Sequence, residues 1–118
     1  MESAPVRMTV RWNLAPGEAR SIAATLQTQM VETRASPGCL GCSLSTDADA
    51  RMVVYYMEEW RSEEDLQRQI RSRRFATLAE LMEHCTAPPV VEFKLRGGTR
   101  GLEYAEQVIE ARNGTDVQ

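Results

Sequence analysis

The chain has 118 residues, of which 42% are hydrophobic and 26% are charged, and its formal net charge at pH 7 is -3. This length suits one domain with a single hydrophobic core, and the composition excludes global disorder. The negative charge disfavours a nucleic-acid partner, and no apolar run approaches the ~20 residues that span a bilayer, so no membrane association is expected.

The cysteine count and the first residues bear on location. Three cysteines, an odd number, fit a reducing compartment better than a disulfide scaffold. The opening run "MESAPVRM" lacks the apolar segment of a signal peptide. We therefore expect a cytoplasmic protein.

The N-terminal half predicts a strand, a helix and a hairpin. Apolar and polar residues alternate in the first segment, as in a strand with one buried face. In the next segment Ile22, Leu26 and Met30 are four residues apart, which places them on one helical face. A Ser-Pro-Gly run ends that helix, and the turn sequence "DADA" separates two further strands. The expected elements are a strand at Val6–Asn13, a helix at Ala19–Arg34, and strands at Cys39–Thr46 and Arg51–Trp60.

The C-terminal half predicts a helical region, a strand and a final helix. Ser62 precedes Glu63, Glu64 and Asp65, a pattern typical of a helix N-cap. Apolar residues then recur at helical spacing, with an arginine-rich corner between two helical pieces. The expected features are helical pieces carrying Leu66 and Ile70 and then Phe75, Leu78, Met82 and Cys85, a strand at Val90–Arg96, a flexible joint at Gly97–Gly101, and a C-terminal helix with Leu102, Ala105 and Ile109 on one face.

The order strand, helix, strand, strand, helix, strand predicts an α+β fold of the ferredoxin-like type, a split β-α-β sandwich with an antiparallel sheet. Residues 1–96 would form this domain, and residues 97–118 a joint with an extra C-terminal helix and tail. In Met52–Met57 both faces of the strand are apolar. Because two helices cover only one face of a sheet, we expect a second copy of the chain on the other face, as a homodimer.

The runs "PGCLGCSL", "YYMEEW", "RSEEDL" and "SRRF" resemble the antibiotic biosynthesis monooxygenase superfamily over roughly Val6 to Arg96. The resemblance implies a dimeric α/β barrel. Members of the superfamily include cofactor-free oxygenases that convert anthrone-like aromatics to quinones, haem-degrading enzymes, and small proteins with no known reaction.

Cys39 and Cys42 raise the question of a metal or redox site, because they have C-x-x-C spacing. Residues three apart on a strand point to opposite faces, so the two thiols would not chelate one ion or form a strain-free disulfide. We interpret both cysteines as structural.

Trp60 matches the tryptophan to which the quinone-forming members assign a part in the reaction. Together with Tyr56, which could hydrogen-bond a phenolate, it is the catalytic candidate; the alternative is that Trp60 is a core aromatic. The resemblance places a small apolar or aromatic ligand in a cavity between helices and sheet, with no cofactor and no metal. The residues expected to bind this ligand are Val10, Trp12, Phe75 and Met82.

The chain also departs from the family pattern. Two asparagines of the oxygenases are matched by Tyr56 and Val10, and the haem-ligand histidine of the haem-degrading members is matched by Ala79. Gln69 stands where many members have a histidine. Two functions follow: a cofactor-independent monooxygenase acting on a quinol-like or anthrone-like aromatic, or a non-catalytic dimeric module that binds a small ligand or a partner.

Two other features have weaker functional meanings. His84 could be a general base, but a histidine near a helix end is more often an exposed residue or a C-cap. The arginines of the corner, Arg68, Arg71, Arg73 and Arg74, could hold an anionic substrate, but such a run is usually the solvated face of a helix.

Overall fold

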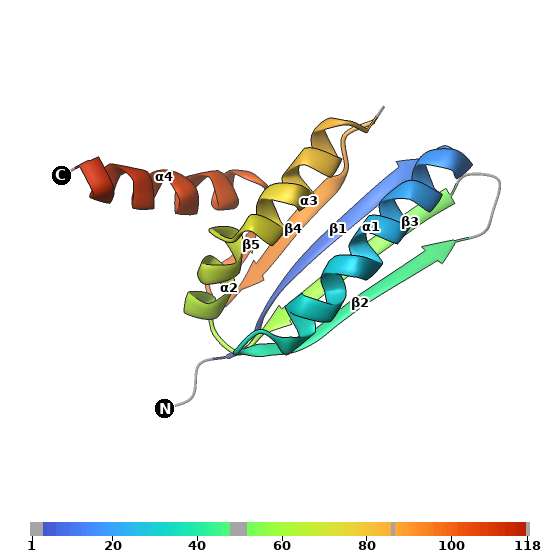
Figure 1. The fold of residues 1–118 in the computed structure, drawn as a ribbon. Coiled ribbons are helices and arrows are strands. Elements are labelled where there is room, and N and C mark those ends of the chain that lie inside the picture. The colour runs from blue at the N-terminus through green and yellow to red at the C-terminus, as the bar shows by residue number, and fades with distance from the viewer. Residues whose placement is uncertain (1–3, 48–51, 86, 118) are drawn as a thin grey trace.

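The computed structural model describes residues 4–47, 52–85 and 87–117, which form one antiparallel sheet with the helices α1 to α3 on one of its faces (Figure 1). The strand order in the sheet is β2-β3-β1-β4-β5. The elements are β1 (Val6–Leu14), α1 (Pro16–Ala35), β2 (Cys39–Asp47), β3 (Met52–Trp60), α2 (Glu63–Ile70), α3 (Arg73–Glu83), β4 (Val90–Leu95), β5 (Gly98–Arg100) and α4 (Glu103–Val117).

The order of the first four strands and the two helical crossovers confirm the predicted ferredoxin-like α+β fold. The turn predicted at residues 47–50 lies largely outside the described residues. The helical region after Ser62 consists of two separate helices, because Ser72 is the N-cap of α3. The Ser72 hydroxyl accepts a hydrogen bond from the Phe75 amide at 3.3 Å. The predicted cap at Ser62 is confirmed in the same way, with the Asp65 amide as donor at 3.2 Å.

The core lies between the helices and one face of the sheet. The alternating apolar residues of β1 are all buried there, and Trp12 is fully inaccessible. Helix α1 contributes the predicted stripe of Ile22, Leu26 and Met30, each buried. The two periodicities read from the sequence therefore meet in a single core.

The turn from α1 into β2 depends on one glycine. Gly38 has φ of 87°, a backbone conformation that residues with a side chain rarely adopt. A carbon added there would also collide with the carboxylate of Asp65. The Gly38 carbonyl accepts a hydrogen bond from the Arg61 amide at 2.8 Å, which connects this turn to the end of β3.

The opposite face of the sheet is open in the single chain. On β3 the side chains of Val53 and Met57 are half-buried and Tyr55 is 46% exposed, and on β4 Val90 is 47% exposed. None of the described helices covers these apolar residues (Figure 1). This is the face that the predicted homodimer would bury.

The C-terminal segment differs from the expectation of a flexible joint followed by a separate helix. Within Gly97–Gly101 the chain forms β5, which pairs with β4. The first turns of α4 bury Tyr104, Ala105 and Val108 in the core, and the ring of Tyr104 lies 5.1 Å from that of Phe93. The start of α4 is therefore part of the same core, because its apolar stripe packs against the neighbouring elements of its own chain. Whether residues 1–96 fold alone stays a prediction.

No helix in the described part of the chain is both long enough and apolar enough to cross a bilayer.

Candidate functional site

A carboxylate that is almost fully buried stands at the end of β3. Tyr56, Glu58 and Trp60 alternate along this strand and so share one face, and the antiparallel register sets Glu58 opposite Met8 of β1 and Cys42 of β2. All three side chains are turned toward the helices, and Glu58 is only 2% exposed. A charged residue in such a place requires hydrogen-bond partners.

Three donors satisfy Glu58. The Tyr56 hydroxyl donates a short hydrogen bond to Oε2, and the Trp60 indole Nε1–H donates to Oε1 at 3.0 Å. The Gln69 side-chain amide of α2 donates to Oε2 at 3.4 Å. The Cys42 thiol donates in turn to the Tyr56 hydroxyl at 3.4 Å. We call these five residues the Glu58 cluster.

Burial dominates the protonation of this cluster. It raises the pKa of Glu58, against the hydrogen bonds from Tyr56, Trp60 and Gln69 that favour the carboxylate. Burial and the neighbouring Glu58 charge raise the pKa of Tyr56, which stays a phenol. Burial likewise raises the pKa of Cys42 to about 11, so its thiol is protonated at neutral pH and is not a nucleophile.

A second layer connects the cluster to α1 and α3. The side-chain oxygen Oε1 of Gln69 accepts a hydrogen bond from Arg74 at 2.9 Å, and Arg74 also donates to the Ser36 hydroxyl at 2.9 Å. The Ser72 hydroxyl donates to the Gln69 backbone carbonyl at 2.6 Å. Trp60, Gln69 and Arg74 line a small hollow of about 120 Å³, where the cluster approaches the surface.

The structure corrects the sequence interpretation of Cys39 and Cys42 in one respect. A β-bulge between Cys39 and Gly41 shifts the register, so Cys39 lies opposite Trp60 and Cys42 opposite Glu58. Because Trp60 and Glu58 share a face, both cysteines are on the helix side and not on opposite faces. Both are free thiols, and no group of three or more His, Cys, Asp and Glu within the described ranges could hold a metal ion.

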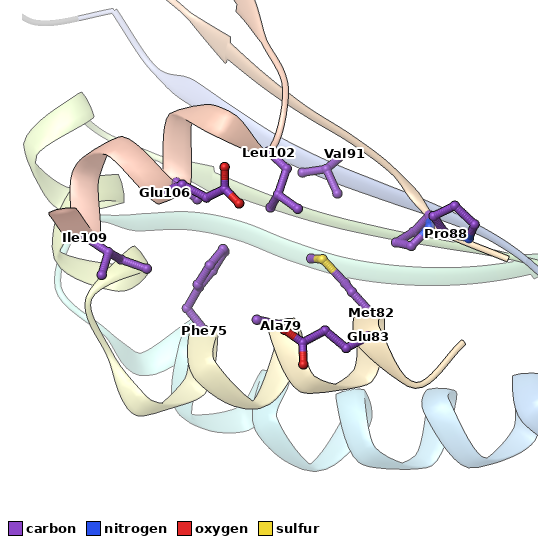
Figure 2. A pocket seen from close by; sticks show the side chains of 11 residues that line it. Phe75, Ala79, Met82, Glu83, Pro88, Val91, Leu102, Glu106 and Ile109 are labelled. Carbon is purple, nitrogen blue, oxygen red and sulfur yellow. The ribbon is translucent and has the colours of Figure 1, made fainter. Parts of the chain in front are cut away.

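A separate apolar cavity of about 550 Å³ opens between α3, β4 and α4 (Figure 2). We call it the α3/α4 cavity. The ring of Phe75 and the thioether of Met82 point into it from α3, opposite Leu102, the residue before α4. Its lining residues are Phe75, Ala79, Met82, Glu83, Pro88, Pro89, Val91, Leu102, Ala105, Glu106 and Ile109.

The residues predicted for one site therefore lie in different places. Phe75 and Met82 line the α3/α4 cavity, whereas Trp60 lines the small hollow and Tyr56 belongs to the Glu58 cluster. Trp12 is buried in the core. Val10 is buried in the middle of the sheet and borders a hollow of about 440 Å³ on its open face.

Two sets of functional candidates were missed by the sequence reasoning. Glu58 was overlooked although it interrupts the apolar alternation between Tyr56 and Trp60, a pattern that marks a buried charge. The contribution of the C-terminal helix to the cavity is also visible in the sequence, as the apolar stripe of Leu102, Ala105 and Ile109. Helical spacing alone, however, does not identify the element against which such a stripe packs.

The weaker candidates have structural partners. His84 is the C-cap of α3, exposed, with Nδ1 2.7 Å from the Glu80 carbonyl. Among the arginines of the corner, Arg68 pairs with Asp65 at 2.9 Å. Arg74 is engaged by Gln69 and Ser36, as described above.

Comparison with known proteins shows the family. A family model described as antibiotic biosynthesis monooxygenase matches residues 5–85, more than half of the 118 residues, and the chain belongs to this family. The resemblance noted in the sequence is thus confirmed. The curated proteins give no match.

Solved structures share the fold. Rv0793 from Mycobacterium tuberculosis is 26% identical with a TM-score of 0.66, and the alignment covers 76% of this chain and 92% of that chain. PA3566 from Pseudomonas aeruginosa is 24% identical with a TM-score of 0.68, covering 81% and 97%. A candidate antibiotic biosynthesis monooxygenase from Deinococcus radiodurans is 15% identical with a TM-score of 0.66, covering 75% and 88%.

The raised pKa of Glu58 gives a prediction for stability. A group whose folded pKa lies above its unfolded value stabilises the fold at low pH and loses that contribution as pH rises through the folded pKa. Glu58→Gln carries no charge, so its stability relative to the parent should improve as pH rises from about 4 to about 8, by about 1 kcal/mol or more, since a tenfold change in an equilibrium constant is about 1.4 kcal/mol. Thermal unfolding of both proteins across this range measures the difference.

The matched control is Glu64→Gln, on an exposed position of α2. The same measurement on this variant gives the pH dependence that comes from removing one exposed charge. A Glu58→Gln difference with no stronger pH dependence than this control would contradict the assignment of a strained, buried charge.

Proposed function

We propose that this family member binds a small, largely apolar aromatic molecule in the α3/α4 cavity. The observation that carries the proposal is the cavity itself: about 550 Å³, lined by Phe75, Met82 and other apolar side chains. Ligand sites for small molecules typically have ~300–1,000 Å³ and a mostly apolar lining with a few polar groups.

Two further observations support this location. Phe75 and Met82 were expected to contact a ligand from the sequence alone, and both line the cavity. Ala79 also lines it, and this residue matches the position of the haem-ligand histidine in the haem-degrading members. An alanine there leaves space for a ligand and offers no bond to a metal.

The ligand proposal is tested by filling the cavity. Ala79→Phe places a ring where the ligand would sit, and we expect binding of a naphthol probe to weaken by about tenfold or more, equivalent to about 1.4 kcal/mol. Isothermal titration calorimetry measures the affinity, and thermal unfolding confirms that the variant is folded.

Ala24→Phe, on the exposed surface of α1, is the matched control and should bind the probe like the parent protein. Absence of naphthol binding to the parent, or equal affinity in Ala79→Phe, would contradict the proposal.

A second candidate is oxidation of an aromatic substrate by O₂ without a cofactor. It is favoured by one observation: Tyr56 and Trp60, the two catalytic candidates, both donate hydrogen bonds to the buried Glu58, whose carboxylate form is a proton acceptor. In such a reaction the deprotonated substrate reduces O₂, one oxygen atom becomes the new carbonyl of the ring and the other leaves as water. The hollow beside Trp60 and Gln69 has only about 120 Å³, so we place this function second.

The second candidate predicts oxygen uptake by the purified protein on anthrones, naphthols or hydroquinones, without added flavin, haem or metal. Loss of the proton acceptor in Glu58→Gln, or of its indole partner in Trp60→Phe, should lower the rate by about 10² or more. An oxygen electrode measures the rate above the spontaneous one. If uptake is absent from the panel, or persists in both variants, only the binding function stands.

We also propose that the functional unit is a homodimer joined through the open face of the sheet. Tyr55 and Val90 offer apolar surface there, flanked by the half-buried Val53 and Met57. Arg11 of β1 is in register with both Tyr55 and Val90, so the apolar surface forms two strips, one on β3 and one on β4, with a charged residue between them. Exposed apolar patches bordered by polar residues are typical of an interaction surface. Dimers are also common in the family.

Sedimentation velocity at micromolar concentration should give a dimer for the parent and for Tyr55→Phe, which keeps the apolar ring. Tyr55→Glu places a charge in the interface and should shift the protein toward monomers. A monomeric parent protein would contradict the proposal.

A further inference from the structure

We infer that the α3/α4 cavity selects aromatic ligands that carry a protonated amine. This rests on the proposed binding function and specifies the class of ligand. The selecting groups are two glutamates, Glu83 of α3 and Glu106 of α4, which stand on facing walls of the cavity (Figure 2).

These glutamates are the only charged side chains among the described residues that line the cavity. The other nine lining residues are apolar: Phe75, Ala79, Met82, Pro88, Pro89, Val91, Leu102, Ala105 and Ile109. The cavity thus combines an apolar floor for a ring with negative charge at its edge. A neutral or anionic ligand would use the first feature only.

Three other glutamates show how such charges are paired within the described residues. Glu59 pairs with Arg7 at 3.3 Å, Glu32 lies 3.8 Å from Arg74, and Glu63 accepts a hydrogen bond from the Tyr104 hydroxyl at 2.7 Å. Within the described ranges no lysine or arginine forms an ion pair with Glu83 or Glu106. Both are exposed, so their charge is available to a ligand.

An adjoining hollow does not supply the missing cation. It shares Phe75, Ala79, Glu83 and Ile109 with the cavity and adds Glu80 and Arg71. The added charges balance each other, so Arg71 leaves the negative charge of the cavity uncompensated. An ammonium group at the edge of the cavity would be attracted by both negative charges.

The test compares three probes of one ring system: naphthylmethylamine, which is cationic, naphthylmethanol, which is its neutral analogue, and naphthoate, which is anionic. At low ionic strength we expect the amine to bind about 3–10-fold more tightly than the alcohol, and the alcohol more tightly than naphthoate. The preference should shrink at ~0.5 M salt, because salt screens exposed charges. Calorimetric titration measures all three affinities.

The double variant Glu83→Gln/Glu106→Gln should bind amine and alcohol equally. Glu32→Gln/Glu64→Gln makes the same change of charge at exposed positions that do not line the cavity and should keep the preference. Comparing the two double variants separates the effect of charge at the cavity from the effect of the protein's net charge.

The outcomes distinguish the two levels of the proposal. Binding of the alcohol without a preference for the amine, or a preference that survives in Glu83→Gln/Glu106→Gln, overturns the inference and leaves the binding function intact. Failure of all three probes to bind overturns the binding function itself. A second copy of the chain that filled the cavity would give this result.

Discussion

The burial of one carboxyl group, Glu58, constrains much of the molecule. A charged group in the core is tolerated only with full hydrogen bonding, and the donors come from two elements: Tyr56 and Trp60 on β3, and Gln69 on α2. Gln69 is then held by Arg74 of α3, which also bonds Ser36 after α1. One polar network thereby fixes where all three helices meet the end of β3, and a change at any member leaves the others unsatisfied.

The separation between the Glu58 cluster and the α3/α4 cavity distinguishes two kinds of function. The cluster is built on β3 and α2, and the cavity lies between α3, β4 and α4 (Figure 2). A reaction would require substrate beside Trp60, whereas simple binding requires only the apolar walls of the cavity. A shared family fold does not choose between them, because function resides in the site and not in the scaffold. The volumes of the two spaces favour binding.

The C-terminal helix supplies one wall of the α3/α4 cavity. Tyr104 anchors the start of α4 through Phe93 and Glu63. Glu106 and Ile109 of this helix line the cavity, as does Leu102 just before it. The family match ends at residue 85, before this helix begins. One wall of the cavity therefore comes from outside the matched region.

The sequence by itself determined the local elements and the family. Alternation defined β1, four-residue spacing defined α1, and Ser62 defined the start of α2, because each signal depends only on near neighbours and on which face is buried. Only the tertiary structure decided the sites. The bulge beside Cys39 reverses the face expected from strand spacing, the partners of Glu58 are fixed by strand register and by α2, and the cavity exists only where α4 returns to α3. These features arise from contacts between distant segments, which local periodicity does not encode.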